Sequence, residues 1–70
     1  MMPLTLAEVG QEKTIMKVGG KNEVKRHLEN LGFAVGSKVT VVSKLAGNLI
    51  ANIKGARIAV GRELAQKIMV

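Results

Sequence analysis

The chain has 70 residues, 47% of them hydrophobic, with one histidine and no cysteine. A chain of this size buries only about 60% of its unfolded surface, and without cysteine it has neither disulfides nor thiolate zinc sites, so its apolar core must hold the fold. Its net charge of +6 favours an acidic partner, which is a nucleic acid, a membrane surface or an acidic face of another protein.

The distribution of apolar residues argues against a membrane protein. No uninterrupted apolar run exceeds three residues, so no segment can span a bilayer, and no direct membrane insertion is expected. The beginning of the chain, MMPLTLAEVG, lacks a basic region followed by an apolar one and is not a secretory signal. We expect a cytoplasmic protein that forms one domain over residues 1–70.

In the first third of the chain one segment has a clear strand pattern. Residues 4–9 are short and mixed, and are interpreted as a turn or a strand. In residues 12–19, Thr14, Met16 and Val18 alternate with Lys13, Ile15 and Lys17. This segment mixes period-2 alternation with β-branched content, which indicates a strand. Gly19 and Gly20 end it, because consecutive glycines adopt backbone angles that other residues avoid.

Residues 21–32 give the strongest helix pattern. Asn22 is a suitable N-cap, and Glu23 in the first turn complements the helix dipole. Gly32 stands where a C′ glycine ends a helix. The apolar positions recur at i, i+4 and i+7 and form one stripe, made of Val24, Leu28 and Leu31.

The second half reads as β structure. Two predicted hairpins connect strands at 38–45, 49–54 and 56–60, with turns at Gly47-Asn48 and Lys54-Gly55. On the second strand one face carries Leu49, Ala51 and Ile53. On the third strand one face carries Ala56, Ile58 and Val60. Residues 61–66 form one helical turn, and KIMV (67–70) is a short closing strand. Such a curled sheet hides its edges best by closing into a barrel.

The chemistry-bearing residues do not form a catalytic pattern. Five scattered carboxylates and one histidine give no acid–base pair or nucleophile with its base, and no phosphate-binding loop is present. We therefore expect a protein that is not an enzyme and needs no cofactor. Shape without reactive groups favours binding.

Glu23 and His27 are the only weak candidates for metal ligands. They lie four residues apart and can share one helix face, but a closed site has about four ligands. An ordinary i,i+4 contact on a helix surface is the favoured interpretation, and a weak or interfacial transition-metal site is the alternative.

Basic residues of the helix are candidates for a partner-binding patch. Lys21, Lys25 and Arg26 form either this patch or a solvated helix face. Arg57 alternates away from the apolar face of its strand, and either joins the patch or blunts a strand edge.

Phe33, the only aromatic residue, follows the glycine that ends the helix. It packs in the core, where its burial contributes about 2 kcal/mol, or it is an apolar anchor for a partner on the loop 33–36. Leu28 has the same two interpretations. In both cases the core is favoured.

Three stretches together resemble the ferrous iron transport protein A (FeoA) family, namely LTLAEVGQEKTIMKVGG, VKRHLENLGFAVGSKVTVV and IKGARIAVGRELAQKIMV. A double glycine, a basic pair, L-x-x-L-G-F-x-x-G, a β-branched strand and G-x-R-I-A follow in order over nearly the whole chain. The connection SKLAGNLI departs from the family, because it lacks the proline and aspartate common in that turn.

The resemblance implies a mainly β fold, a small SH3-like barrel of about five strands with one helix inserted after the first strand. It also implies a cytosolic accessory of a bacterial ferrous iron uptake system that binds and modulates the membrane transporter FeoB. The contacts predicted for that partner are Lys25, Arg26, Leu28, Phe33 and Arg57.

Two other functions remain open. The first is a basic small barrel that binds nucleic acid, although one Phe without Tyr or Trp is a poor platform for base stacking, so nucleic acid is not the expected partner. The second is a metal-sensing regulatory domain, because the same barrel resembles the C-terminal domain of iron-dependent repressors. Weak self-association through an open edge at the strand 67–70 is a further expectation.

Overall fold

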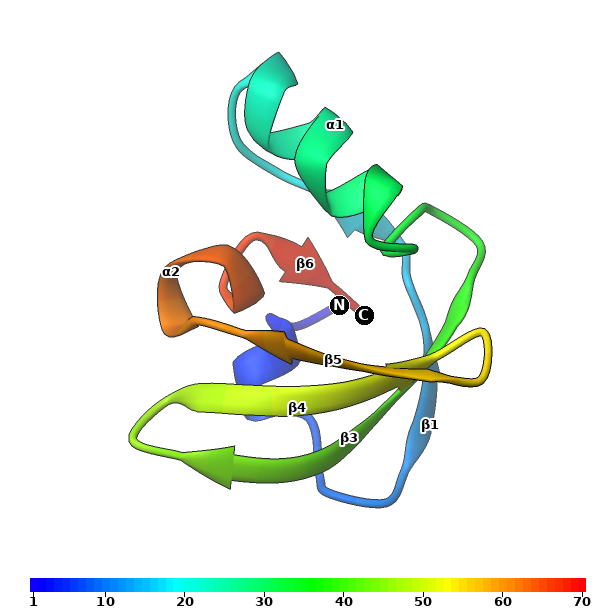
Figure 1. Cartoon of the computed structure of the whole chain (residues 1–70), viewed down its shortest axis with the longest axis vertical. Helices are drawn as coiled ribbons and strands as arrows, with labels where there is room; N and C mark the ends of the chain where they lie inside the picture. Colours follow the sequence, from blue (N-terminus) through cyan, green and yellow to red (C-terminus); the bar gives the residue numbers. More distant parts are fainter.

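The computed structural model describes all residues, 1–70. The strands form two antiparallel sheets (Figure 1), one of four strands in the order β1-β3-β4-β5 and one that pairs β2 with β6. The strands are β1 (Glu12–Thr14), β2 (Lys17–Val18), β3 (Lys38–Leu45), β4 (Asn48–Ile53), β5 (Ala56–Val60) and β6 (Ile68–Met69). The helical elements are the 3-10 turn η1 (Leu4–Leu6) and the helices α1 (Asn22–Asn30) and α2 (Arg62–Ala65).

The predicted strand 12–19 is two strands, which corrects the sequence analysis. Ile15 and Val18 are both buried while Met16 is 59% exposed, a pattern that one regular strand cannot produce because its faces alternate strictly. The N–H of Ile15 donates to the carbonyl of Ser37 beside β3, and the N–H of Met16 donates to the carbonyl of Met69 in β6. The chain therefore crosses from the first sheet to the second at this point.

Both hairpins are present, but the first turn is displaced by one residue from the prediction. The turn residues are Ala46 and Gly47, with φ of 53° and 84°, and Asn48 is already the first residue of β4. Positive φ at both positions defines a type I′ turn, whose twist matches that of the flanking strands. The second turn is Lys54-Gly55, as predicted, with φ of 50° and 79°.

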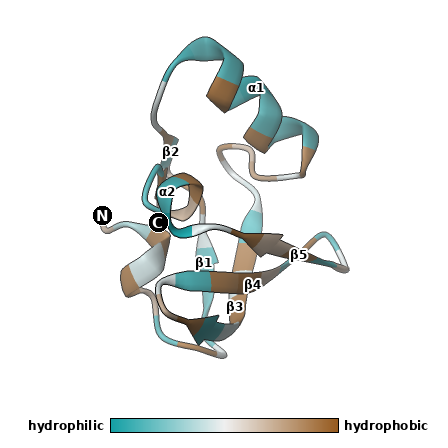
Figure 2. Ribbon diagram, turned by 60° about the vertical axis from the view of Figure 1, so that its left-hand side comes forward, coloured by the Kyte–Doolittle hydropathy of each residue, from teal (hydrophilic) through white to brown (hydrophobic).

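The core is one cluster of fourteen buried residues between the sheets and the helices. Strand β4 alternates without interruption, because Leu49, Ala51 and Ile53 are buried and the residues between them are exposed. In β5 only Val60 is buried, while Ile58 is half-buried and Ala56 is exposed. The face predicted to carry these three residues is therefore buried only at the C-terminal end of the strand. Coloured by hydropathy, α1 has brown patches on a teal helix (Figure 2), as expected for a helix with one apolar stripe.

The C-terminal strand does not have the open edge that the sequence analysis expected. On one side β6 pairs with β2, through Lys17 with Met69 and Val18 with Ile68. On its other side the N-terminal segment covers it, because Met2 and Val70 exchange both backbone hydrogen bonds, at 2.9 and 2.8 Å. The prediction of self-association through this strand is therefore wrong, since both edges of β6 are occupied.

The mainly β architecture and the helix after the first β segment are confirmed. The count of about five strands becomes six, because the predicted first strand is divided. Residues 4–6 form a 3-10 turn, and the predicted helical turn at 61–66 is α2.

Candidate partner-binding surface

Helix α1 begins one residue earlier than the capping pattern predicted. Lys21 is the N-cap, with an extended backbone at φ −71° and ψ 162°, and Asn22 is the first helical residue. No side chain caps this end by a hydrogen bond, so Asn22 does not have the capping role assigned to it. Glu23 lies in the first turn, as expected.

The C-terminal end of α1 is closed by a Schellman motif. The N–H of Gly32 donates to the carbonyl of Glu29, and the N–H of Phe33 donates to the carbonyl of Leu28, each at 2.9 Å. Gly32 has φ of +106°, the left-handed conformation that the motif needs and that favours glycine. An apolar contact between the third residue from the helix end and the second beyond the cap often accompanies this motif, and here those residues are Leu28 and Phe33.

Leu28 and Phe33 are both fully buried in the core cluster. The preferred interpretation of both as core residues is therefore confirmed. Neither side chain has surface that a partner could touch in this conformation, so the alternative of exposed anchors is wrong for this fold. In the same loop Val35 is 65% exposed.

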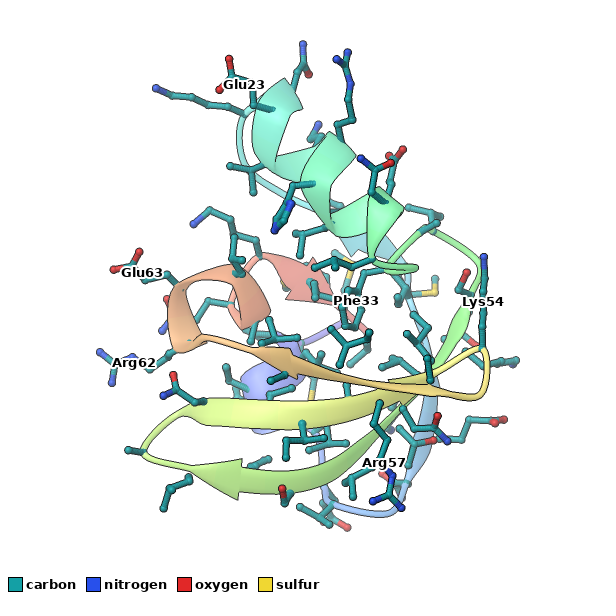
Figure 3. The ribbon with its side chains drawn as sticks, viewed as in Figure 1. Glu23, Phe33, Lys54, Arg57, Arg62 and Glu63 are labelled. Carbon is teal, nitrogen blue, oxygen red and sulfur yellow. The ribbon has the colours of Figure 1, made fainter.

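The basic residues predicted to form a docking patch lie on α1 and at its N-cap. Lys21 and Arg26 are exposed and Lys25 is half-buried. The same helix carries Glu23 and Glu29, both exposed, so its surface has mixed charge. Figure 3 shows Glu23 at the end of the helix that is far from the sheets.

Arg57 does not join the residues on α1. It lies in the middle of β5 opposite Asn52 of β4, which in turn is opposite Thr40 of β3. Figure 3 shows its side chain on the sheet, at the opposite end of the molecule from α1. The structure therefore separates the predicted contacts into two surfaces, one with Lys25 and Arg26 and one with Arg57.

Glu23 and His27 occupy consecutive turns of α1, and both are exposed. Nowhere in the structure do three or more His, Cys, Asp or Glu side chains come together in a way that could hold a metal ion. The two candidates therefore provide at most two ligands, fewer than the four of a closed structural site.

The outer face of the larger sheet carries an open groove that no pattern in the sequence indicated. It has a volume of about 390 Å³ and runs along the outer rows of β3, β4 and β5. Leu45, which is 81% exposed, Ile50, which is 40% exposed, and Ala59 contribute its apolar lining. Alternation in 49–54 already places Ile50 on the outside, but the register that pairs Ile50 with Ala59 comes from the fold.

Neither helix combines the length and the apolar character that crossing a bilayer requires.

Comparison with known proteins identifies the family of this sequence. The model of the FeoA domain matches residues 2–70. A curated protein of Methanocaldococcus jannaschii named "Putative Fe(2+) transport protein A" is 39% identical over 70 residues, which are 100% of this chain and 85% of that protein.

Solved structures share the fold. An iron uptake regulatory protein (FeoA) superposes with a TM-score of 0.90 at 26% identity, over 99% of this chain and 92% of the other. A FeoA of Stenotrophomonas maltophilia, solved with zinc and described as an SH3 domain protein, superposes with a TM-score of 0.84 at 22% identity. The match covers 100% of this chain and 89% of the other. The predicted SH3-like fold is thereby confirmed.

A manganese-dependent transcriptional repressor gives a TM-score of 0.85 at 22% identity, over 94% of this chain and 38% of the repressor. At this identity the likeness concerns the fold alone. A shared barrel therefore does not by itself separate transport accessories from regulatory domains.

Proposed function

Because this chain belongs to the FeoA family, we propose that it is a cytosolic accessory of a ferrous iron uptake system, which binds the cytosolic region of a FeoB-type transporter and modulates uptake. The observation that supports this proposal most strongly is the 39% identity, over the whole chain, to the protein named for Fe(2+) transport. In this role the protein acts by binding, and Fe²⁺ is the cargo of the system.

The charge of the protein supports an acidic docking partner. The net charge is +6, and three of the predicted contact residues, Lys25, Arg26 and Arg57, retain accessible side chains. Complementary charge mainly accelerates association and selects partners. We propose these three as contacts, with the pair on α1 and Arg57 on β5 touching different parts of the partner.

A binding titration tests this proposal. The purified chain is titrated with the cytosolic region of the ferrous iron transporter from the same organism, and the dissociation constant is measured for the wild type and for two double variants. Lys25→Glu with Arg26→Glu should weaken binding about tenfold. Lys13→Glu with Lys17→Glu is the matched control, because these residues have the same combination of half-buried and exposed side chains and the net charge changes equally.

Two results would contradict the proposal. Absence of binding by the wild-type chain would remove the transporter as its partner. An equal loss of affinity in both double variants would mean that α1 contributes only through the total charge, and would remove Lys25 and Arg26 as contacts.

A further inference from the structure

Strand β5 has one free edge. In the four-stranded sheet it stands last, and β4 is its only neighbouring strand (Figure 1). The other terminal strand, β1, has three residues, whereas β5 has five and is about 17 Å long. Proteins protect such edges with proline, bulges, inward-pointing charges, very short strands or charged side chains on the edge. Of these β5 has only the last, in Arg57, and this charge repels basic chains but attracts an acidic one.

The backbone groups on this edge are identified by the hairpin register. In the turn at Lys54-Gly55 the closing residues Ile53 and Ala56 form a hydrogen-bonded pair. Backbone groups then point alternately toward β4 and away from it. Ala56, Ile58 and Val60 face β4, so the N–H and C=O groups of Arg57 and Ala59 point outward. No backbone hydrogen bond from a turn, loop or cap reaches either residue.

The side chains along this edge are mainly basic. Figure 3 shows Lys54 and Arg62 at the two ends of β5 and Arg57 between them, with Glu63 beside Arg62 as the acidic exception. All four are exposed. Between these charges lie Ile58, which is half-buried, and Ala59, so the edge offers apolar contacts as well.

We infer that the edge of β5 binds an extended acidic segment of a protein partner by strand addition. The segment becomes a fifth strand beside β5, with main-chain hydrogen bonds to Arg57 and Ala59 and with carboxylates near Lys54, Arg57 and Arg62. Main-chain bonds supply affinity and alternate side chains supply specificity in this type of recognition. The inference deepens the proposed function and rests on it for the transporter as the source of the segment.

A second copy of the chain fits the edge less well. Antiparallel pairing of two β5 strands would join two molecules that each carry a charge of +6. It would also place both Arg57 side chains on one face as diagonal neighbours, which are close enough to repel. An acidic segment has no such cost.

Hydrogen exchange at individual amides tests strand addition directly. In the free chain the amides of Arg57 and Ala59 should exchange rapidly, while those of Ile58 and Val60 are protected by β4. The probe is a seven-residue peptide of alternating glutamate and valine with threonine at each end, and its counterpart has lysine in place of glutamate. The acidic peptide should slow exchange at Arg57 and Ala59 at least tenfold, and the lysine peptide should leave it unchanged.

Two variants of the edge separate its backbone role from its charge. Ala59→Pro removes the outward N–H without touching a bond to β4, and should abolish binding of the acidic peptide, whereas Ala59→Ser keeps the N–H and the affinity. Arg57→Gln should weaken binding about two- to fivefold, the value of one exposed ion pair. This last variant and the exchange data decide the matter even when Ala59→Pro does not fold.

Several outcomes would overturn the inference. Slow exchange at Arg57 and Ala59 in the free chain, together with a dimer in sedimentation, would mean that a second copy occupies the edge. Equal effects of the acidic and basic peptides, or changes at α1 alone, would reject an acidic added strand.

The transporter region provides a separate measurement. Equal binding of this region to the wild type and to Ala59→Pro would leave the proposed function intact and reject the β5 edge as its docking site. Binding of the acidic peptide without binding of the transporter region would do the opposite, supporting the edge and rejecting the transporter.

Discussion

Replacement of Phe33 tests how the loop after α1 is built. Phe33 is fully buried, whereas Val35, two residues later in the same loop, is 65% exposed. Truncation of a buried Phe costs about 3–5 kcal/mol, and a 70-residue domain is stable by roughly 3–10 kcal/mol. Phe33→Ala should therefore remove about a third or more of the free energy of unfolding, whereas Val35→Ala should change it by less than about 0.5 kcal/mol.

Phe33→Leu provides a variant that remains folded and measurable. It conserves most of the volume and should cost about 1 kcal/mol, or about 4–8 °C in the melting temperature of a domain of this size. Urea unfolding gives the free energy and thermal unfolding the melting temperature; both are followed by circular dichroism, since the chain has no tryptophan.

The same variants separate a core residue from a partner anchor. Phe33→Leu should bind the transporter region within about twofold of the wild type, because its side chain has no exposed surface. A cost below about 1 kcal/mol for Phe33→Ala, or a loss of binding by Phe33→Leu at unchanged stability, would refute the assignment of Phe33 to the core.

Two further predictions concern the hairpin turns and α2. Gly47 and Gly55 are both turn residues at positive φ, but a Cβ at Gly47 would overlap the Cδ of Arg62, whereas a Cβ at Gly55 meets nothing within 4 Å. Gly55→Ala should cost about 1–2 kcal/mol in unfolding free energy from backbone strain, and Gly47→Ala should cost more. Adding Arg62→Ala to Gly47→Ala should remove the excess, whereas equal costs for Gly47→Ala and Gly55→Ala would contradict the predicted overlap. The Oδ1 of Asn48 accepts a hydrogen bond of 3.0 Å from the N–H of Arg62 at the start of α2, so Asn48→Ala should cost about 1 kcal/mol in urea unfolding, and an equal cost for Asn52→Ala, on the same strand, would argue against a cap.

Patterns of neighbouring residues determined much of this structure. The helix, its glycine end and the alternation of β4 could be predicted because they depend on contacts within a few residues. The second turn was also predicted, since glycine at positive φ is a local requirement. Family membership follows in the same way from ordered short motifs, which the match over residues 2–70 confirms.

The errors have a common physical cause. The strand 12–19 divides because consecutive residues donate to different partners, Ile15 to Ser37, which precedes β3 of one sheet, and Met16 to Met69 of β6 in the other. Asn48 leaves the predicted turn and caps α2, which is fourteen residues away in the chain. Such partners are brought together only by the tertiary fold, so local patterns do not reveal them.

The sequence by itself therefore determined the class of fold, the helix and the basic character of the surface, because these depend on composition and on short-range periodicity. The tertiary structure decided which residues are accessible. It buried Leu28 and Phe33, separated Arg57 from the basic residues of α1, closed both edges of β6 and left one edge of β5 free. Accessibility depends on which distant segments pack together, and that is settled only when the sheets close around the core.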